Sequence, residues 1–177
     1  MKLNILEFIP DQINNIPVKT SSNGDFIEIS RKGTGSPKPI TVKKEIEMND
    51  FFMEVIGLYF GDGLNTRKGT GNRRTAFANS NYELQLQWIN FLERTGLKKE
   101  ALFAQLSIGK NHQYKNKEIL EYWINKTNLP SNVFSKISNN KEISCQEGIL
   151  SLEFNSIICK QPPIRDWGHF CLGCKAA

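Results

Sequence analysis

Residues 53–66 read "MEVIGLYFGDGLNT", and they set the expectations for the whole chain. In the longer run "FFMEVIGLYF", Glu54 is the only charged residue, and Asn49 or Asp50 just before it can cap a helix. A helix without a polar face is buried on nearly all sides. The stretch therefore predicts a helix that packs against other elements over most of its surface.

Two glycines and a carboxylate give this helix a chemical character. Gly57 and Gly61 are four residues apart and share one face, where small residues let two helix backbones approach closely. Asp62 comes next at the carboxyl end, where the helix dipole disfavours a negative charge unless a cation compensates it. Two such helices side by side would bring two carboxylates together, and their mutual repulsion indicates a divalent-metal site. The alternative is a core helix that ends in an ordinary Gly-Asp-Gly turn.

The segment "VIGLYFGDG", residues 55–63, resembles the nine-residue signature of the LAGLIDADG homing endonucleases. The positions identical to the signature are Gly57, Leu58, Asp62 and Gly63. The later segments "FANSNYELQLQWINFLERTGL", "LSIG" and "EILEYWINKT" resemble the strands and helices after the signature in archaeal members, so the resemblance spans about residues 49–154. It implies an α+β fold, namely a LAGLIDADG-type mixed αββαββ-like domain whose antiparallel sheet binds DNA.

The resemblance also implies a catalytic centre. In this family two signature helices form an interface, and an acidic residue from each binds divalent metal beside the scissile phosphates. Asp62 is then the catalytic metal ligand with Gly61 beside it, and Mg²⁺ or Mn²⁺ is the cofactor. Many members place a basic residue near the metals, and we take Lys136 for that role, with Lys141 as the other candidate by order along the chain.

A single signature implies a homodimer, whose twofold symmetry would match a pseudo-palindromic DNA site. The residues expected at this dimer interface are Val55, Gly57, Leu58 and Gly61.

The stretch "GLNTRKGTGNRRTAFAN", residues 63–79, predicts two strands joined by a glycine-rich basic turn. In the family these strands and turns lie in the major groove, where cations contact phosphates and guanidinium groups read bases. The DNA-binding candidates by resemblance are Thr66, Arg67, Lys68, Arg73 and Arg74. A solvated hairpin turn is the alternative.

Two further regions are candidates for DNA contact. The basic loop "GKNHQYKNK", residues 109–117, contains Lys110 and His112 and is either DNA-facing or an ordinary surface turn. Asn79 and Asn81 fall where the family organises water near its active site, although each is equally plausible as a helix cap. We include Asn79 among the DNA-binding candidates.

The chain divides into three parts by pattern. Residues 1–48 form a strand-rich extension, residues 49–160 the endonuclease-like domain, and residues 161–177 an irregular tail. Ser80 and Glu83 make a capping box before a helix that ends near Gly96. A strand, a second amphipathic helix and a final strand occupy residues 101–154. The tail holds a Cys-x-x-Cys pair and His169, but one such pair is thin evidence for zinc, and a frayed tail is preferred.

Composition sets wider bounds. The 177 residues, 39% hydrophobic and 23% charged, fit one globular domain. A net charge of +5 is compatible with a DNA partner but is shared by many proteins without one. No apolar run reaches the roughly 18 residues of a membrane-spanning helix, and the N-terminus lacks a signal-peptide pattern. We therefore expect no membrane partner and an intracellular location, in the cytoplasm or nucleoid.

These patterns predict a sequence-specific double-stranded DNA endonuclease that acts as a homodimer through metal-activated water. A non-cleaving DNA-binding regulator of the same fold is the first alternative. The second is a structural domain whose signature helix serves only to dimerise.

Overall fold

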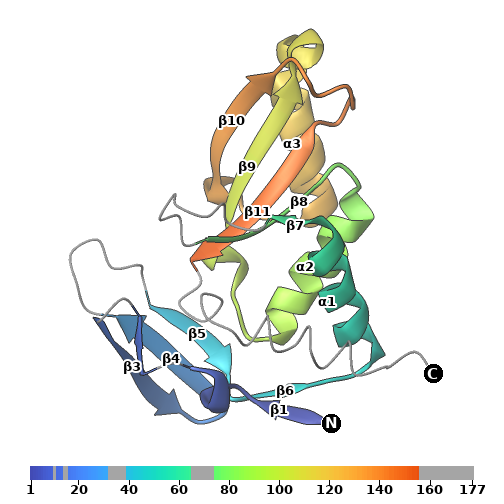
Figure 1. Ribbon diagram of the computed structural model, residues 1–177. Helices are drawn as coiled ribbons and strands as arrows, with labels where there is room; N and C mark the ends of the chain where they lie inside the picture. Colours follow the sequence, from blue (N-terminus) through green and yellow to red (C-terminus); the bar gives the residue numbers. More distant parts are fainter. Residues whose placement is uncertain (10, 14–15, 32–38, 65–73, 156–177) are drawn as a thin grey trace.

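The computed structural model describes residues 1–9, 11–13, 16–31, 39–64 and 74–155. Within these ranges the chain is α+β, as predicted, with three α-helices and three antiparallel or mixed sheets (Figure 1). The irregular tail and the loop at residues 32–38 lie outside the described residues.

The N-terminal region is built from strands, which confirms the prediction of a strand-rich extension. Antiparallel pairing joins four strands in the order β2-β3-β4-β5. A separate antiparallel pair, β1 with β6, leads into the first helix. The bounds of these strands are β1 Lys2–Asn4, β2 Gln12–Ile13, β3 Ile16–Asn23, β4 Phe26–Arg31, β5 Ile40–Lys43 and β6 Glu45–Glu47.

The larger sheet has the strand order β10-β9-β11-β8-β7. Its strands are β7 Gly63–Leu64, β8 Arg74–Asn79, β9 Phe103–Gly109, β10 Phe134–Asn140 and β11 Ile149–Asn155. The expectation of a wholly antiparallel sheet is wrong for one pair, because β9 and β10 are parallel. A parallel pair needs a long crossover, and helix α3 (Asn116–Thr127) supplies it. The observed order therefore differs from αββαββ by one additional helix, α3, and one additional strand.

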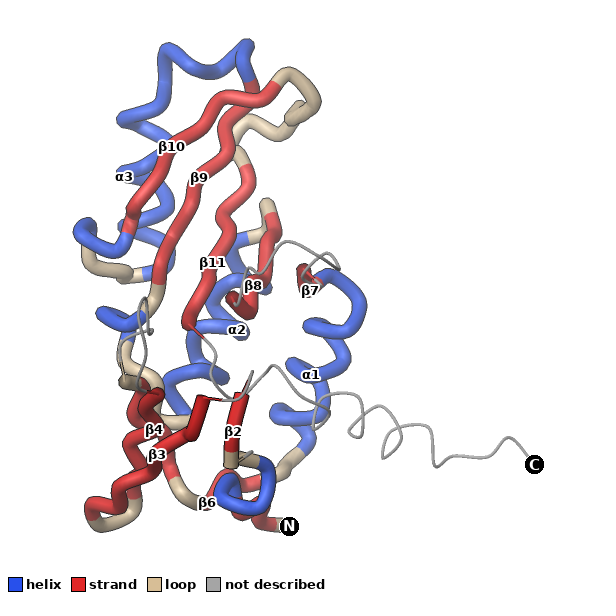
Figure 2. Tube along the Cα trace, turned by 60° about the vertical axis from the view of Figure 1, so that its left-hand side comes forward, coloured by secondary structure: helices blue, strands red, loops and turns tan. Residues whose placement is uncertain are grey.

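Helices α2 (Tyr82–Arg94) and α3 lie against the same face of this sheet (Figures 1 and 2). Side-chain hydrogen bonds fasten both helices to the sheet or its connections. Gln85 Nε2 donates to the carbonyl oxygen of Leu150 at 2.6 Å, and Trp123 Nε1 donates to that of Glu147 at 2.6 Å. The positions of α2 and α3 on the sheet are therefore fixed by these hydrogen bonds as well as by apolar packing.

The cap of α2 differs from the predicted capping box. Asn81, not Ser80, is the residue before the first helical turn, and its side-chain oxygen accepts a hydrogen bond from the backbone N–H of Glu83 at 2.8 Å. The helix begins at Tyr82, which leaves Ser80 one position too early to cap it.

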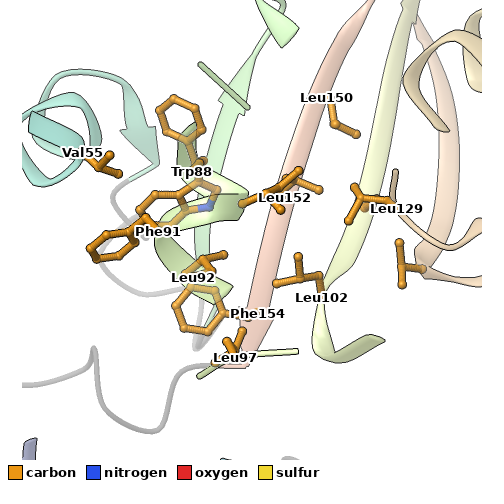
Figure 3. Close-up of a cluster of buried hydrophobic side chains, with 14 of the residues drawn as sticks. Val55, Trp88, Phe91, Leu92, Leu97, Leu102, Leu129, Leu150, Leu152 and Phe154 are labelled. Atoms are coloured by element: carbon orange, nitrogen blue, oxygen red, sulfur yellow. The ribbon is translucent and has the colours of Figure 1, made fainter. Parts of the chain in front are cut away.

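The core lies between the helices and the large sheet and is drawn in Figure 3. Trp88 stacks on Tyr59 and Phe91, with ring centroids 5.1 and 5.4 Å apart. Leu150 and Leu152 of β11 complete this layer at 0% exposure. The cluster continues into the N-terminal sheet, whose apolar residues Ile27, Ile29, Ile40 and Val42 belong to the same core. The strand-rich extension is therefore packed onto the domain that comes after it.

Gly96 joins these two parts. It ends α2 as predicted, at φ +93°, a conformation that favours glycine. Directly before it, the carbonyl oxygen of Thr95 accepts a hydrogen bond from the backbone N–H of Lys43 at 2.8 Å. A Cβ atom added to Gly96 would lie 2.9 Å from the backbone nitrogen of Lys43, so the close approach requires glycine.

We predict that Gly96→Ala lowers the free energy of unfolding by more than about 2 kcal/mol, because backbone strain and collision add. Gly24→Ala is the matched control: its φ is +56°, but an added Cβ meets nothing within 4 Å. Strain alone should cost it about 1 kcal/mol. Urea denaturation of both variants measures the difference, and equal losses would contradict the proposed junction.

Candidate functional site: the α1 stripe and the open sheet face

Helix α1 (Asp50–Asp62) carries the residues that the sequence singled out. Its first turn is capped by Asn49, whose side-chain oxygen accepts a hydrogen bond from the backbone N–H of Phe52 at 3.0 Å. Of the two caps that the sequence allowed, Asn49 is the one that makes this bond.

One face of α1 is buried within the chain. Phe52, Val55 and Ile56 have exposed fractions of 4%, 0% and 9%. The expectation that Val55 lies at a dimer interface is wrong, because its side chain is enclosed in the chain's own core. Helical periodicity alone did not reveal this, since Glu54 is the only charged residue in the interior of α1 and one charge defines no polar face.

The opposite face of α1 is exposed and includes the two glycines. We call the residues Met53, Gly57, Phe60 and Gly61 the α1 stripe. Met53 and Phe60 are 41% and 47% exposed, large fractions for apolar side chains on a helix. A Cβ atom added to Gly57 or Gly61 meets nothing within 4 Å, so the described part of the chain leaves the stripe free. Leu58, also predicted at the interface, is half-buried beside it.

Met53 and Phe60 are not among the interface residues predicted from the sequence. Their signal was available: both recur with the glycines at helical spacing and fall on the same face.

Asp62 is the last residue of α1, and its side chain lies outside the described part of the structure. No basic residue occupies the last turn of α1, so no cation within this helix offsets a carboxylate at its negative end. The last four carbonyl groups of a helix, including that of Gly61, have no partner in the helix and can serve as oxygen ligands. The predicted oxygen donors Asp62 and Gly61 therefore fit a hard divalent cation.

Among the residues whose side chains are described, no group of three His, Cys, Asp or Glu residues could hold a metal ion. A site at Asp62 would then draw its remaining ligands from water, phosphate oxygens or a second copy of the chain. The cysteines and His169 of the tail lie outside the described residues.

The large sheet has one face that the helices do not cover. In β9 and β11 the buried residues alternate with half-exposed ones, and the strand register places Ser151 beside Gln105 on the half-exposed side. Lys136 of β10 pairs in register with Gln105 on its other side, so the three residues form one row across the sheet. In the next row of this face, Ser107 Oγ and Ser138 Oγ lie 3.1 Å apart. We call this side, opposite α2 and α3 in Figure 2, the open face. Its polar side chains are Gln105, Ser107, Lys136, Ser138, Ser151 and Glu153.

The structure does not bring Lys136 to Asp62. Lys136 is on β10 and Asp62 precedes β7, and these strands form opposite edges of the sheet. Four strand spacings of about 4.8 Å separate them, about 19 Å in all, which is beyond the reach of a lysine side chain. The prediction that Lys136 acts beside the Asp62 of its own chain is therefore wrong, because strand order and not chain order decides which residues meet.

The remaining DNA-binding candidates have different outcomes. Antiparallel pairing of β7 with β8 confirms the predicted pair of strands, and Arg74 begins β8. Asn79 Oδ1 accepts a hydrogen bond from the backbone N–H of Asn81 at 2.8 Å, so this side chain shapes the turn before α2. The basic turn itself, with Thr66, Arg67, Lys68 and Arg73, lies outside the described residues.

Lys110 and His112 belong to a short 3₁₀ helix, η3 (Lys110–Lys115), at the end of β9. Lys110 is exposed, while His112 is half-buried.

Comparison of the chain with models of protein families, with curated proteins and with solved structures gives no match. No helix in the described ranges is both long and apolar enough to cross a membrane.

We predict that Gly57→Leu converts the homodimer implied by the resemblance into a monomer, because a bulky side chain blocks close approach at the stripe. The isolated helix should not suffer, since leucine has the better helix propensity by about 0.8 kcal/mol. Analytical ultracentrifugation measures the mass. Asn125→Leu, which adds similar bulk on the exposed face of α3, should leave the mass unchanged. A Gly57→Leu protein that remains dimeric would refute an interface at the stripe.

Proposed function

We propose that this chain is a metal-dependent, sequence-specific endonuclease for double-stranded DNA that acts as a homodimer through the α1 stripe. One observation carries the proposal: an exposed stripe with two glycines ends at Asp62, and the chain then runs directly into edge strand β7 of the large sheet. The dimer contact, the acidic residue and the DNA-facing sheet are thus consecutive in one short segment. The resemblance of residues 55–63 to the LAGLIDADG signature supports the same assignment.

The α1 stripe has the form that a second helix would fit. Gly57 and Gly61 offer a shallow surface, and Met53 and Phe60 beside them supply apolar area to bury. A twofold axis through this contact would bring the two Asp62 residues close together. Both carboxylates would then share the negative ends of two helices, a place that favours divalent cations. Bound there, Mg²⁺ or Mn²⁺ would lower the pKa of a water molecule and offset charge on the phosphate.

The open face suits a DNA duplex. Small side chains on this side of the sheet project little from the backbone, so that the edge of a DNA groove can approach the strands closely. They are Ser107, Ser151 and Ala78. Gln105 in the same row offers both a donor and an acceptor, as base readout requires. The major groove is about 12 Å wide and admits a two-stranded ribbon, so the β7–β8 pair can enter it.

One observation favours the alternative, a DNA-binding regulator that does not cleave. The basic residue expected near the metal is not there in the described structure, since Lys136 lies at the opposite edge of the sheet. Binding through the open face does not require a basic residue beside Asp62, whereas the resemblance implies one near the metals of a cleaving enzyme. The two functions differ in the chemistry at Asp62 and not in the DNA surface.

We predict that the protein linearises members of a plasmid library in Mg²⁺ or Mn²⁺, and that EDTA abolishes cleavage. Asp62→Asn should reduce the cleavage rate by about 100-fold or more, because the metal contributes several kcal/mol to the transition state. Asp50→Asn, at the other end of the same helix, is the matched control and should cleave normally. Sequence-specific binding without a metal-dependent cut would support the regulator instead.

A second prediction separates binding from catalysis at Lys136. Lys136→Ala should lower the slope of log K against log salt by about one, because one phosphate contact is lost. The cleavage rate at saturating DNA should not change. Lys98→Ala, an exposed lysine that comes after α2, is the control and should leave the slope unchanged. If Lys136→Ala lowers the cleavage rate at saturating DNA and leaves the salt slope unchanged, Lys136 acts in catalysis and not in DNA binding.

A further inference from the structure

The end of the large sheet carries an exposed aromatic residue among cations. Tyr114, in η3, is 75% exposed, and Lys115 Nζ lies 5.8 Å from the centroid of its ring. Lys110 and Lys117 flank it along the chain, and both are exposed. Lys141 comes directly after β10, whose last residue pairs in register with Gly109 just before η3, so this lysine joins the same end of the sheet.

The carboxylates of this region lie outside η3. Glu142 is next to Lys141 in the chain, and Glu118 and Glu121 lie on α3. Glu121 is paired with Lys117 at 4.0 Å. Glu147 lies at the end of the loop that contains Lys141, so four acids stand against the four lysines of this region. Segment η3 itself carries Lys110 and Lys115 beside the tyrosine and no carboxylate, so the positive charge is concentrated at Tyr114.

The local backbone holds η3 in place. A Cβ atom added to Gly109 would collide with the carbonyl oxygen of Ile143, so the chain before η3 packs tightly against the loop after β10. Asn116, which ends η3 and begins α3, is half-buried. An exposed tyrosine on an anchored turn costs less entropy to bind than one on a loose loop.

The open face leads directly to this turn. Lys136, Ser138 and Asn140 alternate along β10 on the same side as Gln105, Ser107 and Gly109. A duplex that lies on the open face along these strands therefore meets η3 about 13 Å beyond Gln105, four residues at about 3.3 Å each.

We propose that η3 clamps the sugar–phosphate backbone at the flank of the DNA site, with Tyr114 packed on a deoxyribose and its hydroxyl donating to a phosphate. Lys110 and Lys115 contact the adjacent phosphates. The inference rests on the proposed DNA-binding function and adds to it a contact that is independent of base sequence. Tyrosine hydroxyls and lysines are among the groups that commonly position proteins on phosphates.

The test is a salt titration of binding to duplex DNA by fluorescence anisotropy, with the full chain and a set of single variants. Tyr114→Ala should weaken binding about three- to tenfold at every salt concentration, with an unchanged slope, because tyrosine is uncharged. Tyr114→Phe, which keeps the ring, should lose less. Lys115→Ala should lower the slope by about one, whereas the control Lys98→Ala should not.

The outcomes separate the two proposals. If the wild-type protein does not bind duplex DNA, the proposed function fails and the clamp fails with it. If the wild type binds but Tyr114→Ala and Lys115→Ala bind equally well, the clamp alone is refuted. A Tyr114→Ala loss that is confined to one base sequence, or to unpaired DNA, also refutes it, because a backbone contact acts on all duplexes alike. Thermal unfolding checks that each variant is folded, and Tyr114→Phe provides the conservative variant.

Discussion

The stacking of Trp88 on Tyr59 is the contact on which the arrangement of the site depends. The two rings lie 5.1 Å apart at an interplanar angle of 10°, and they join α2 to α1. Because Trp88 also packs against Phe77 of β8, the same side chain fixes α1 relative to the large sheet. This contact decides which face of α1 is turned inward. Gly57 and Gly61 are consequently turned outward, and the helix delivers Asp62 to the edge of the sheet.

The sequence predicted most of the helices and strands of residues 49–155 but not strand β10 (Phe134–Asn140), and it did not predict which elements lie side by side. Periodicity and caps predicted α1, α2 and α3, and alternation predicted the strands around residues 103–109 and 149–154. The face of α1 that packs inward could not be predicted, since the single charge of Glu54 inside the helix defines no polar face. Val55 was therefore placed at the wrong surface. Lys136 was misplaced for a similar reason: strand order arises from long-range pairing, which no local pattern of residues encodes.

The N-terminal sheet contributes to the same core instead of standing apart from it. Its apolar residues join the cluster that contains Phe52 and Leu92, and Gly96 permits the approach of Lys43. Strain at Gly96 would therefore be felt in both parts of the molecule. Since only two residues separate β6 from α1, the N-terminal sheet also helps to fix where the helix begins. Its contribution to the site is thus through the position of α1, not through ligands.

Dimerisation and DNA binding are coupled by charge in the proposed enzyme. Each chain carries +5, so two copies carry +10, and a duplex that contacts both releases counterions from both. The open face of one chain offers few cations in its described part, Lys136 chief among them, so a monomer would hold DNA weakly. A symmetric pair doubles these contacts without any new residue, and the second half-site is bound at a high effective concentration. The α1 stripe would then govern affinity for DNA although it touches none.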